Sequence, residues 1–366
     1  MTDIVIVGAG VIGLMTAREL ARAGVKVTLL ERGAAAREAS WAGGGIVSPL
    51  YPWRHGEAVT RLALWSQSSY IQLSQELLQE TGVDPELRQK GILMVDVYDQ
   101  AQALQWGHDH FRPLVEVDSA FIHEKEPRVS QSFQSAIWMP DVASIRNPRL
   151  GRALRTYAEN HPLIELREHC AIEGFCVEGE RVVGVRTTAG EYRAEHTVLS
   201  AGAWSGELLE TLGLKLAIEP VRGQMMVFRA EPGLIDRIVM LDGRYLIPRS
   251  DGRILVGSTL EKVGFDKQTT EEARQSLYET ALTILPDLAQ YPVEHHWAGL
   301  RPGSPEGIPY IGQVPGWSGL HLNCGQYRNG LVLAPASTRL LSDLLLDRAP
   351  IVDPALYAVA GRIEQS

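Results

Sequence analysis

Cysteine is scarce in this chain of 366 residues, which contains only three. Cys170, Cys176 and Cys324 leave one cysteine without a partner and show no Cys-x-x-Cys spacing, so the sequence predicts neither a disulfide framework nor a zinc site. His295 and His296 are neighbours on an expected strand, where successive side chains point to opposite faces. We therefore expect no metal site and a reducing compartment.

Positive charge and long apolar runs are also lacking. The 35 Lys and Arg residues are outnumbered by 44 Asp and Glu residues, a balance that does not favour nucleic-acid binding. Leu340 to Leu346 is interrupted by Asp343, and no segment approaches the roughly 18 apolar residues of a membrane span. Asp3 stands where a signal peptide carries Lys or Arg, so we expect this segment in the mature protein. These absences predict a soluble, cytoplasmic protein that binds a small molecule, with neither nucleic acid nor a membrane as partner.

The first thirty residues alternate between strand-like and helix-like patterns. Asp3 to Val7 and Lys26 to Leu30 are short, continuously apolar runs typical of buried parallel strands. Val11 to Ala23 has the apolar spacing of a helix, and Gly24 follows it where a left-handed cap is favourable. This βαβ pattern predicts an α/β fold of the Rossmann type.

Later segments contain further strand and helix patterns. Helices are expected at about Val59 to Glu80, after Asn147, at Glu271 to Leu285 and at Leu331 to Leu346. Strands are expected at Gly91 to Asp96, Arg181 to Thr187, His196 to Ser200, Val221 to Arg229, Tyr245 to Pro248, Arg253 to Gly257 and Leu320 to Asn323. The length suggests two domains. We expect a discontinuous α/β domain of residues 1–85, 145–215 and 300–366, with an inserted, mainly antiparallel domain of residues 86–144 and 216–299.

The turn after the first strand carries the sequence Gly-Ala-Gly-Val-Ile-Gly. Gly8 permits a tight turn, Gly10 lets the backbone approach a pyrophosphate, and Gly13 lets the helix pack closely on the strand. The helix N-terminus offers unpaired N–H groups to phosphates. Glu31 follows about 20 residues later, where a carboxylate accepts hydrogen bonds from ribose hydroxyls. Together these features predict a dinucleotide-binding site.

The glycine motif alone does not separate NAD from FAD. Thr197 to Ser205 reads as an apolar strand that ends in small residues before a helix, and Gly202 allows a nucleotide to approach closely. Asn329 and Gly330 open the last long helix, whose positive end would stabilise negative charge on a reduced flavin. An ordinary capped helix explains these two residues equally well. The wider pattern favours FAD.

Six segments in one order along the chain carry a family resemblance. They are GAGVIG with Glu31, SAGAWSG at 200–206, YLIPR at 245–249, GLRPG at 299–303, GIPYIG at 307–312 and YRNGLVLAP at 327–335. Together they resemble the glycine oxidase family of thiamine biosynthesis, within the D-amino-acid oxidase group of FAD proteins. The resemblance covers nearly the whole chain.

The resemblance implies a FAD-dependent oxidase of glycine and other small amines, such as sarcosine or small D-amino acids. In this family a hydride passes from the substrate to flavin N5, O2 is reduced to hydrogen peroxide, and the product serves thiamine thiazole biosynthesis. Sarcosine-oxidase relatives attach FAD through a cysteine that is missing between Arg301 and Tyr310, so non-covalent FAD is expected. The α/β domain would then bind FAD and the inserted domain the substrate. We also expect a homo-oligomer.

Three side chains are expected at the substrate end of the site. Arg301 matches the family arginine that binds the substrate carboxylate, where a planar guanidinium gives two parallel hydrogen bonds. Tyr245 matches a tyrosine that meets the same carboxylate, and Arg328 matches a second arginine nearby. A surface-loop position for Arg301 and a packing role for Tyr245 remain the structural alternatives.

The resemblance also assigns residues to the cofactor. The adenosine end is expected at Val11, Ile12, Glu31 and Arg32, with Ala171 near the adenine. The diphosphate and the flavin edge are expected at Ser40, Gly43, Gly44 and Gly45, with Gly202 and Trp204 also in contact. The flavin is expected to lie along Gln326, Tyr327, Arg328, Asn329, Gly330, Leu331 and Val332.

Two features depart from the family pattern or leave the activity open. The loop Pro49 to Glu57 matches no family motif, although a site-covering element is expected there, and Leu260 could tune which side chains fit.

Two alternative functions stay open. One alternative is a dehydrogenase of the same fold that passes electrons to a quinone or a protein. Another is a FAD-binding subunit without catalysis. Retention of both Arg301 and Tyr245 argues against the second alternative.

Overall fold

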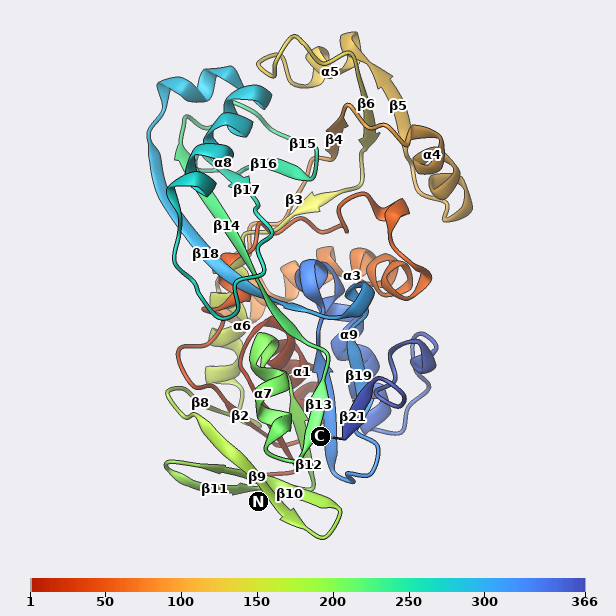
Figure 1. The fold of residues 1–366 in the computed structure, drawn as a ribbon, viewed down its shortest axis with the longest axis vertical. Coiled ribbons are helices and arrows are strands. Elements are labelled where there is room, and N and C mark those ends of the chain that lie inside the picture. Colours follow the sequence, from red (N-terminus) through yellow and green to blue (C-terminus); the bar gives the residue numbers. More distant parts are fainter. Residues whose placement is uncertain (1, 366) are drawn as a thin grey trace.

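The computed structural model describes residues 2–365 and arranges them around two large sheets, one toward each end of the molecule (Figure 1). The six-stranded sheet has the order β19-β20-β12-β1-β2-β8. Its strands are β1 (Ile4–Val7), β2 (Val27–Leu30), β8 (Ile164–Arg167), β12 (His196–Leu199), β19 (Tyr310–Gln313) and β20 (Leu320–Cys324). All neighbours pair in parallel except β19 and β20. This arrangement is the one that the βαβ pattern predicts.

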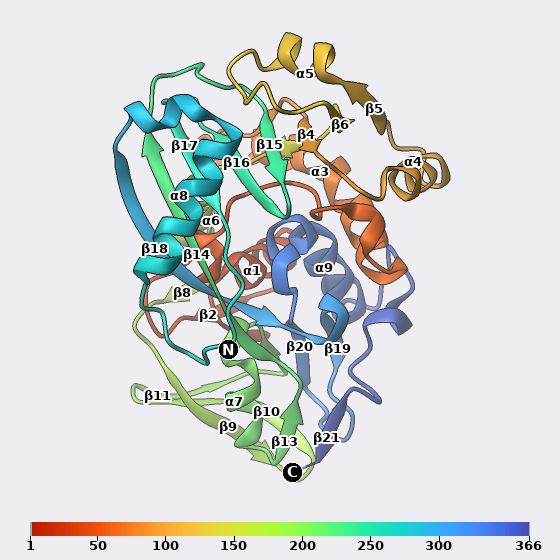
Figure 2. The ribbon, with the colours of Figure 1, turned by 45° about the horizontal axis from the view of Figure 1, so that its top comes forward.

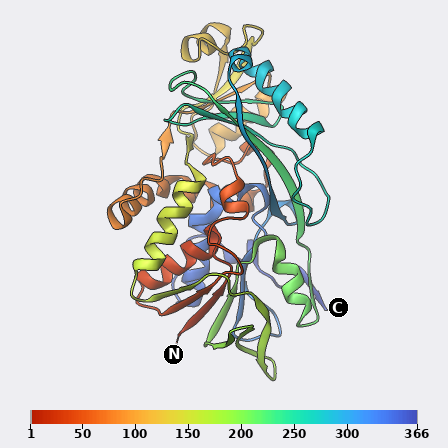
Figure 3. The same ribbon diagram turned by 90° about the vertical axis from the view of Figure 1, so that its left-hand side faces the viewer.

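The strands of this sheet are apolar along their length because both faces are covered. Ile4 and Ile6 of β1 pack into the same core as helices α1 (Val11–Arg22), α3 (Glu57–Thr81), α6 (Asn147–Asn160) and α9 (Gly330–Leu345). Val5 and Val7 point the other way, into a core shared with a three-stranded sheet of β9 (Ile172–Glu178), β10 (Arg181–Thr187) and β11 (Gly190–Arg193) (Figure 3). Within residues 2–365, none of the helices combines the length and apolar character needed to cross a bilayer.

The eight-stranded sheet is mainly antiparallel and has the order β18-β14-β17-β16-β15-β4-β6-β5. Its strands are β4 (Ile92–Val95), β5 (Val115–Asp118), β6 (Ser135–Met139), β14 (Glu219–Arg229), β15 (Ile238–Leu241), β16 (Arg244–Pro248), β17 (Arg253–Gly257) and β18 (Val293–Gly303). Helix α8 (Glu271–Ile284) covers one face, where Met226 and Phe228 are buried. Met225 points to the other face, together with Tyr245. The long strands β14 and β18 extend from this sheet toward the six-stranded one (Figure 2).

Shorter elements complete the described chain. The helices are α2 (Ala39–Ala42), α4 (Gln100–Asp109), α5 (Ser119–Lys125) and α7 (Ser205–Glu210), and the short strands are β3 (Arg88–Gln89), β7 (Ala143–Ser144), β13 (Leu214–Leu216) and β21 (Ile363–Gln365). Single 3-10 turns lie at Pro52–Arg54, Gly202–Trp204, Pro286–Gln290, Pro305–Gly307, Tyr327–Asn329 and Pro354–Tyr357.

The predicted α/β fold class is confirmed, and the expected helices and strands lie within a few residues of those observed. The sequence pattern predicts no helix or strand between β4 and α6, yet this segment includes α4, β5, α5 and β6. The reason is weak amphipathicity, since β5 is an exposed edge strand and α4 buries only Ala103 and Gly107. The expected division into two domains stays a prediction.

Two histidines meet between β12 and β20, and their burial has a consequence for stability. Nε2 of His321 lies 3.2 Å from Nδ1 of His196. Burial lowers the pKa of His321 to about 4, and the charge of His196 acts in the same direction. In the unfolded chain His321 titrates near pH 6.5, its ordinary pKa. Between these pH values the unfolded state binds more protons than the folded state, so stability decreases as the pH falls.

As the pH falls from about 6.5 to about 4, we expect His321 to lower the free energy of unfolding by up to about 3 kcal/mol. His321→Gln should lose that part of the pH dependence. Urea unfolding at a series of pH values, with saturating FAD, measures it. His295→Gln changes an exposed histidine and serves as the control. A His321→Gln profile parallel to that of the wild type would contradict the assignment.

Candidate active site

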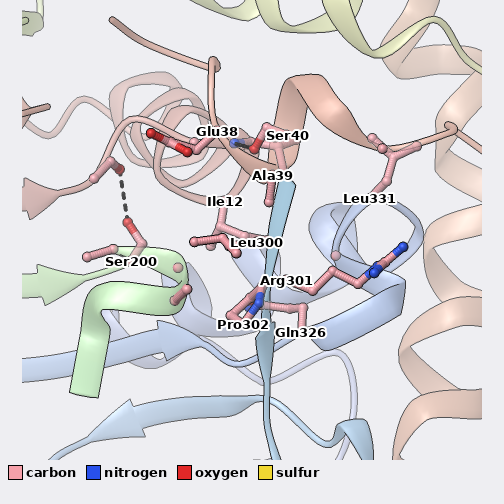
Figure 4. Close-up of a pocket in the computed structure, with 18 of the residues that line it drawn as sticks. Ile12, Glu38, Ala39, Ser40, Ser200, Leu300, Arg301, Pro302, Gln326 and Leu331 are labelled. Carbon is pink, nitrogen blue, oxygen red and sulfur yellow. Dashed lines mark hydrogen bonds between the residues drawn. The ribbon is translucent and has the colours of Figure 1, made fainter. Parts of the chain in front are cut away.

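An elongated cavity of about 430 Å³ begins at the carboxyl ends of β1, β2 and β12 and reaches the eight-stranded sheet (Figure 4). Ligands of doubly wound folds bind at such carboxyl ends. Every residue assigned to the cofactor or substrate from the sequence lines this cavity, with the exceptions of Gly13 and Leu260. The cavity is also lined by residues that the sequence did not assign to the cofactor or the substrate, among them Glu38, Ala39, Ile46, Ser48, Leu50, Asn147, Ser200, Glu207, Ser258, Leu300, Pro302 and Asn323.

The three glycines of the first turn have different environments. Gly8 has φ of +97°, and a Cβ atom there would lie 2.6 Å from the Ser200 carbonyl oxygen. A Cβ atom on Gly13 would lie 1.9 Å from the Gly8 carbonyl oxygen, so this glycine serves the packing of helix on strand and faces away from the cavity. A Cβ atom on Gly10 would meet only Ser40 Oγ, at 3.2 Å. The open side of Gly10 is therefore the side of the cavity.

A carboxylate and a set of backbone N–H groups flank this turn. Glu31 accepts hydrogen bonds from the backbone N–H groups of Ala9 and Gly33, both at 2.9 Å, which fixes the carboxylate at the cavity. Ser40 Oγ accepts a hydrogen bond of 2.8 Å from the N–H of Val11, the first residue of α1. The next N–H groups of α1 have no partner within the helix. This combination of donors and a carboxylate fits the pyrophosphate and the ribose of a dinucleotide.

An aromatic side chain and a guanidinium close the same end of the cavity. The Arg32 guanidinium carbon lies 3.6 Å from the centre of the Trp204 ring, and Trp204 stacks on Phe265 with ring centres 5.5 Å apart. Arg32, Trp204 and Ala171 all line the cavity, and Ala171 follows β8 in the chain. The sequence assignment places Arg32 and Ala171 at the adenosine end and gives Trp204 as a contact of the cofactor.

The Gly43 to Gly45 segment is held in place by a buried arginine that the sequence did not assign. Arg249 donates hydrogen bonds to the carbonyl oxygens of Gly44, at 2.6 Å, and Ile145, at 3.1 Å. Burial lowers the pKa of Arg249 to about 10. A Cβ atom on Gly44 would lie 2.8 Å from Ile247 Cδ1, so the chain passes here without room for a side chain. Arg249 is the last residue of the YLIPR motif, and that motif is the sequence signal by which a role of Arg249 at the site could have been predicted.

Arg301 lies within β18 with its guanidinium at the cavity, so its alternative as a surface-loop residue is wrong. One terminal nitrogen donates to Ser258 Oγ at 2.7 Å and the other to the Thr259 carbonyl oxygen at 3.2 Å. No carboxylate among residues 2–365 lies within ion-pair distance of it. Burial lowers the pKa of Arg301, which reflects a cation held without a compensating charge. Such a guanidinium is a binding site for a carboxylate.

Tyr245 and Arg328 reach the cavity as expected, although in different ways. Tyr245 is buried in β16, and its hydroxyl has only the sulfur of Met225 as partner, at 3.6 Å. Because thioether sulfur is a weak acceptor, this hydroxyl remains available to a ligand. Arg328 is exposed at the cavity edge, in the turn before α9. Leu260 is 48% exposed and is not a lining residue, so the structure gives no support to its expected contact with the substrate.

The loop Pro49 to Glu57, which matched no motif, borders the cavity through Leu50. Arg54 binds Asp99, the residue before α4, with two hydrogen bonds of 2.7 Å. Trp53 donates a hydrogen bond of 2.8 Å to the same carboxylate. The loop is thus tied to the start of α4, beside the expected substrate end of the site.

A glycine turn suited to a dinucleotide, continued by a pocket with an arginine that lacks an acidic partner in residues 2–365, is typical of a nucleotide-dependent oxidoreductase. The sequence matches the DAO family, described as FAD dependent oxidoreductase, over residues 3–344. The chain belongs to this family of FAD-dependent oxidoreductases, and its cofactor is FAD.

Similar proteins carry more specific names. Glycine oxidase of Pseudomonas aeruginosa is 57% identical over 98% of this chain and 99% of its own length. Glycine oxidase of Pseudomonas putida is 54% identical over 99% of both chains. The bifunctional protein ThiO/ThiG of Trichormus variabilis is 34% identical, and the match covers 97% of this chain and 54% of that protein. The crystal structure of glycine oxidase from Geobacillus kaustophilus superposes with a TM-score of 0.92 over 98% of each chain at 29% identity.

The open side of Gly10 yields a test of the cofactor site. Gly10→Leu should place a side chain where the pyrophosphate approaches, so we expect a folded protein that is purified with little FAD. The ratio of flavin absorbance to protein concentration measures this, and circular dichroism checks the fold. Gly56→Ala, at a position with open space around it and φ of −70°, is the control for a glycine substitution. A Gly10→Leu protein with full flavin content would refute the assignment.

Proposed function

We propose that this protein oxidises glycine and other small amines, such as sarcosine and small D-amino acids, with O2 as the electron acceptor, and that it serves thiamine thiazole biosynthesis. The observation that carries the proposal is the half-buried Arg301 guanidinium, which lines the cavity and has no carboxylate partner in residues 2–365. The names of the similar proteins, glycine oxidase and ThiO/ThiG, support the substrate and the biosynthetic role.

Bound FAD supplies the acceptor for a hydride from the substrate α-carbon and passes the electrons to O2, which yields hydrogen peroxide. The chain itself has to bind and orient the substrate. Two N–H groups of Arg301 would bind the carboxylate in parallel, and the Tyr245 hydroxyl would add a third hydrogen bond. The amino group reacts in its neutral form. The resulting imine is hydrolysed by water to glyoxylate and ammonia when the substrate is glycine.

The assignments of single residues and of the domains belong to the same proposal. Residues 1–85, 145–215 and 300–366 would form the FAD-binding domain, and residues 86–144 and 216–299 the substrate-binding domain. The cavity contacts of Glu31, Arg32 and Trp204 support an adenosine end opposite Tyr245, Arg301 and Arg328. We further propose a cytoplasmic homo-oligomer with non-covalent FAD, since the stretch Arg301 to Tyr310 contains no cysteine.

Peroxide release by the purified holoenzyme tests the reaction. With glycine in air we expect one hydrogen peroxide for each glyoxylate formed. Glycine that bleaches the flavin under nitrogen, followed by little peroxide in air, would instead indicate a dehydrogenase with a quinone or protein acceptor. A flavin that no small amine reduces under nitrogen would refute the proposed oxidation.

Arg301→Ala tests the carboxylate site. Because the substrate carboxylate loses its charge-assisted partner, we expect the KM for glycine to rise by about a hundredfold or more. Steady-state peroxide assays at high glycine concentration measure KM and kcat separately. Arg61→Ala, whose exposed guanidinium pairs with the exposed carboxylate of Glu57 on α3, is the control for losing an arginine. An unchanged KM for glycine would remove Arg301 from the site.

Tyr245→Phe tests the second carboxylate contact. The hydroxyl has only a weak sulfur partner, so its removal leaves no strong buried group unsatisfied. We therefore expect a smaller increase of KM than for Arg301→Ala, about five- to tenfold. A loss as large as that of Arg301→Ala would show that the tyrosine holds the substrate as firmly as the arginine does.

A further inference from the structure

Four consecutive residues of β14 lie next to Arg301 and alternate between two environments. Strand geometry places Gly223 and Met225 on the face that β14 shares with Arg301, and Arg222 and Gln224 on the opposite face. A Cβ atom on Gly223 would lie 2.0 Å from a terminal nitrogen of Arg301, so the guanidinium rests directly on this glycine. Met225 contacts the Tyr245 hydroxyl.

Gln224, on the other face, is fully buried and does not line the cavity. Its backbone N–H donates to Thr259 Oγ1 at 2.9 Å, and its carbonyl accepts from the Thr259 N–H at 3.2 Å. Its side-chain amide donates to Glu261 at 2.9 Å and accepts from the backbone N–H of Thr270 at 2.9 Å. Gln224 thus fixes both ends of the segment 259–270 to β14.

The same segment holds the guanidinium of Arg301. Ser258 Oγ and the Thr259 carbonyl oxygen are its two hydrogen-bond acceptors in the chain. Because these two acceptors fix the plane of the guanidinium, any shift of residues 258 and 259 changes where its remaining N–H groups point. Those groups have to meet a substrate carboxylate.

A second effect concerns charge. Glu261 and Asp266 are the carboxylates of this segment, and Glu261 lies two residues after Thr259. It accepts hydrogen bonds from Arg222, at 3.0 Å to Nε, from Gln224 and from Thr259. These bonds hold the pKa of Glu261 below its usual value, although burial acts in the opposite direction. Glu261 is therefore ionised and fully engaged, and it does not neutralise Arg301.

We propose that Gln224 is a positioning residue, which sets the affinity of Arg301 for the substrate carboxylate by clamping residues 258–261 and holding Glu261 away from the guanidinium. This inference rests on the proposed function of Arg301 as the carboxylate site. Gln224 touches neither the cavity nor the reacting atoms, so its effect passes through Thr259, Ser258 and Glu261.

Gln224→Met keeps the size of the side chain and removes its polar atoms. We expect the KM for glycine and the Kd for acetate to rise by about fivefold, with kcat within about twofold of the wild type. Acetate binding to the holoenzyme is followed through the change in flavin absorption, which needs no turnover. Met226→Ala, the next residue on the same face of β14, is the control for lost packing and should leave the Kd for acetate unchanged.

Thr259 provides an independent pair of variants should Gln224→Met fail to fold. Thr259→Val removes the hydroxyl that bonds both Gln224 and Glu261, and we expect the Kd for acetate to rise by about tenfold. Thr259→Ser retains the hydroxyl and should stay within about twofold of the wild type.

The outcomes separate this inference from the proposed function. Wild-type acetate affinity in Gln224→Met or in Thr259→Val would overturn it, and so would an equal loss in Met226→Ala or in Thr259→Ser. Failure of the wild type to oxidise any small amine would refute the proposed function alone, because acetate binding would still report on Arg301.

Discussion

The site depends on a guanidinium that is half-buried, largely removed from water, and without a negative partner among residues 2–365. Placing the cation of Arg301 in a densely packed environment is unfavourable, and the two neutral acceptors at Ser258 and Thr259 offset only part of that penalty. A ligand that brings a carboxylate supplies the missing charge. The same feature therefore weakens the free protein and strengthens binding of an anionic substrate, as expected for residues that are arranged for function.

Other arginines of the same sheet show that this arrangement is specific. Arg222 is also buried, yet it binds the carboxylates of Glu261 and Asp266. Arg253 binds Glu294 with two hydrogen bonds of 2.6 Å. Arg249 resembles Arg301 in having only neutral acceptors, and it too acts at the cavity, where it fixes the backbone of Gly44. Arg244 of β16 also donates only to neutral acceptors, Ser276 and Thr280 of α8, but it does not line the cavity, so Arg301 and Arg249 differ from it in their position at the site.

The parts of the site that the sequence predicted are those whose signal is local. Gly8, Gly10, Gly13 and Glu31 lie in one βαβ unit, and the spacing within that unit determines their environment. Arg301 and Tyr245 required the family resemblance, because the residues around them do not show which face of a strand they occupy. Gln224 and Gly223 carried no signal of their own, and Arg249 only its place in the YLIPR motif, since their contacts join positions that are far apart along the chain. Helix α4 and strand β5 were missed for a related reason, as few of their residues face a core.

The pairing of β14 with β18 shows why such long-range contacts matter. Arg301 pairs with Val221, and Gly299 pairs with Gly223, so the guanidinium extends along its own face toward the glycine. A shift of this pairing by one residue would turn Arg301 to the face of Gln224, because side chains alternate along a strand. The carboxylate site would then be lost although every residue of its motif were retained. The eleven-residue length of both strands, which run from the α8-covered core to the FAD cavity, makes such a shift costly. The register of one strand pair thereby joins the stability of the sheet to the position of a single positive charge.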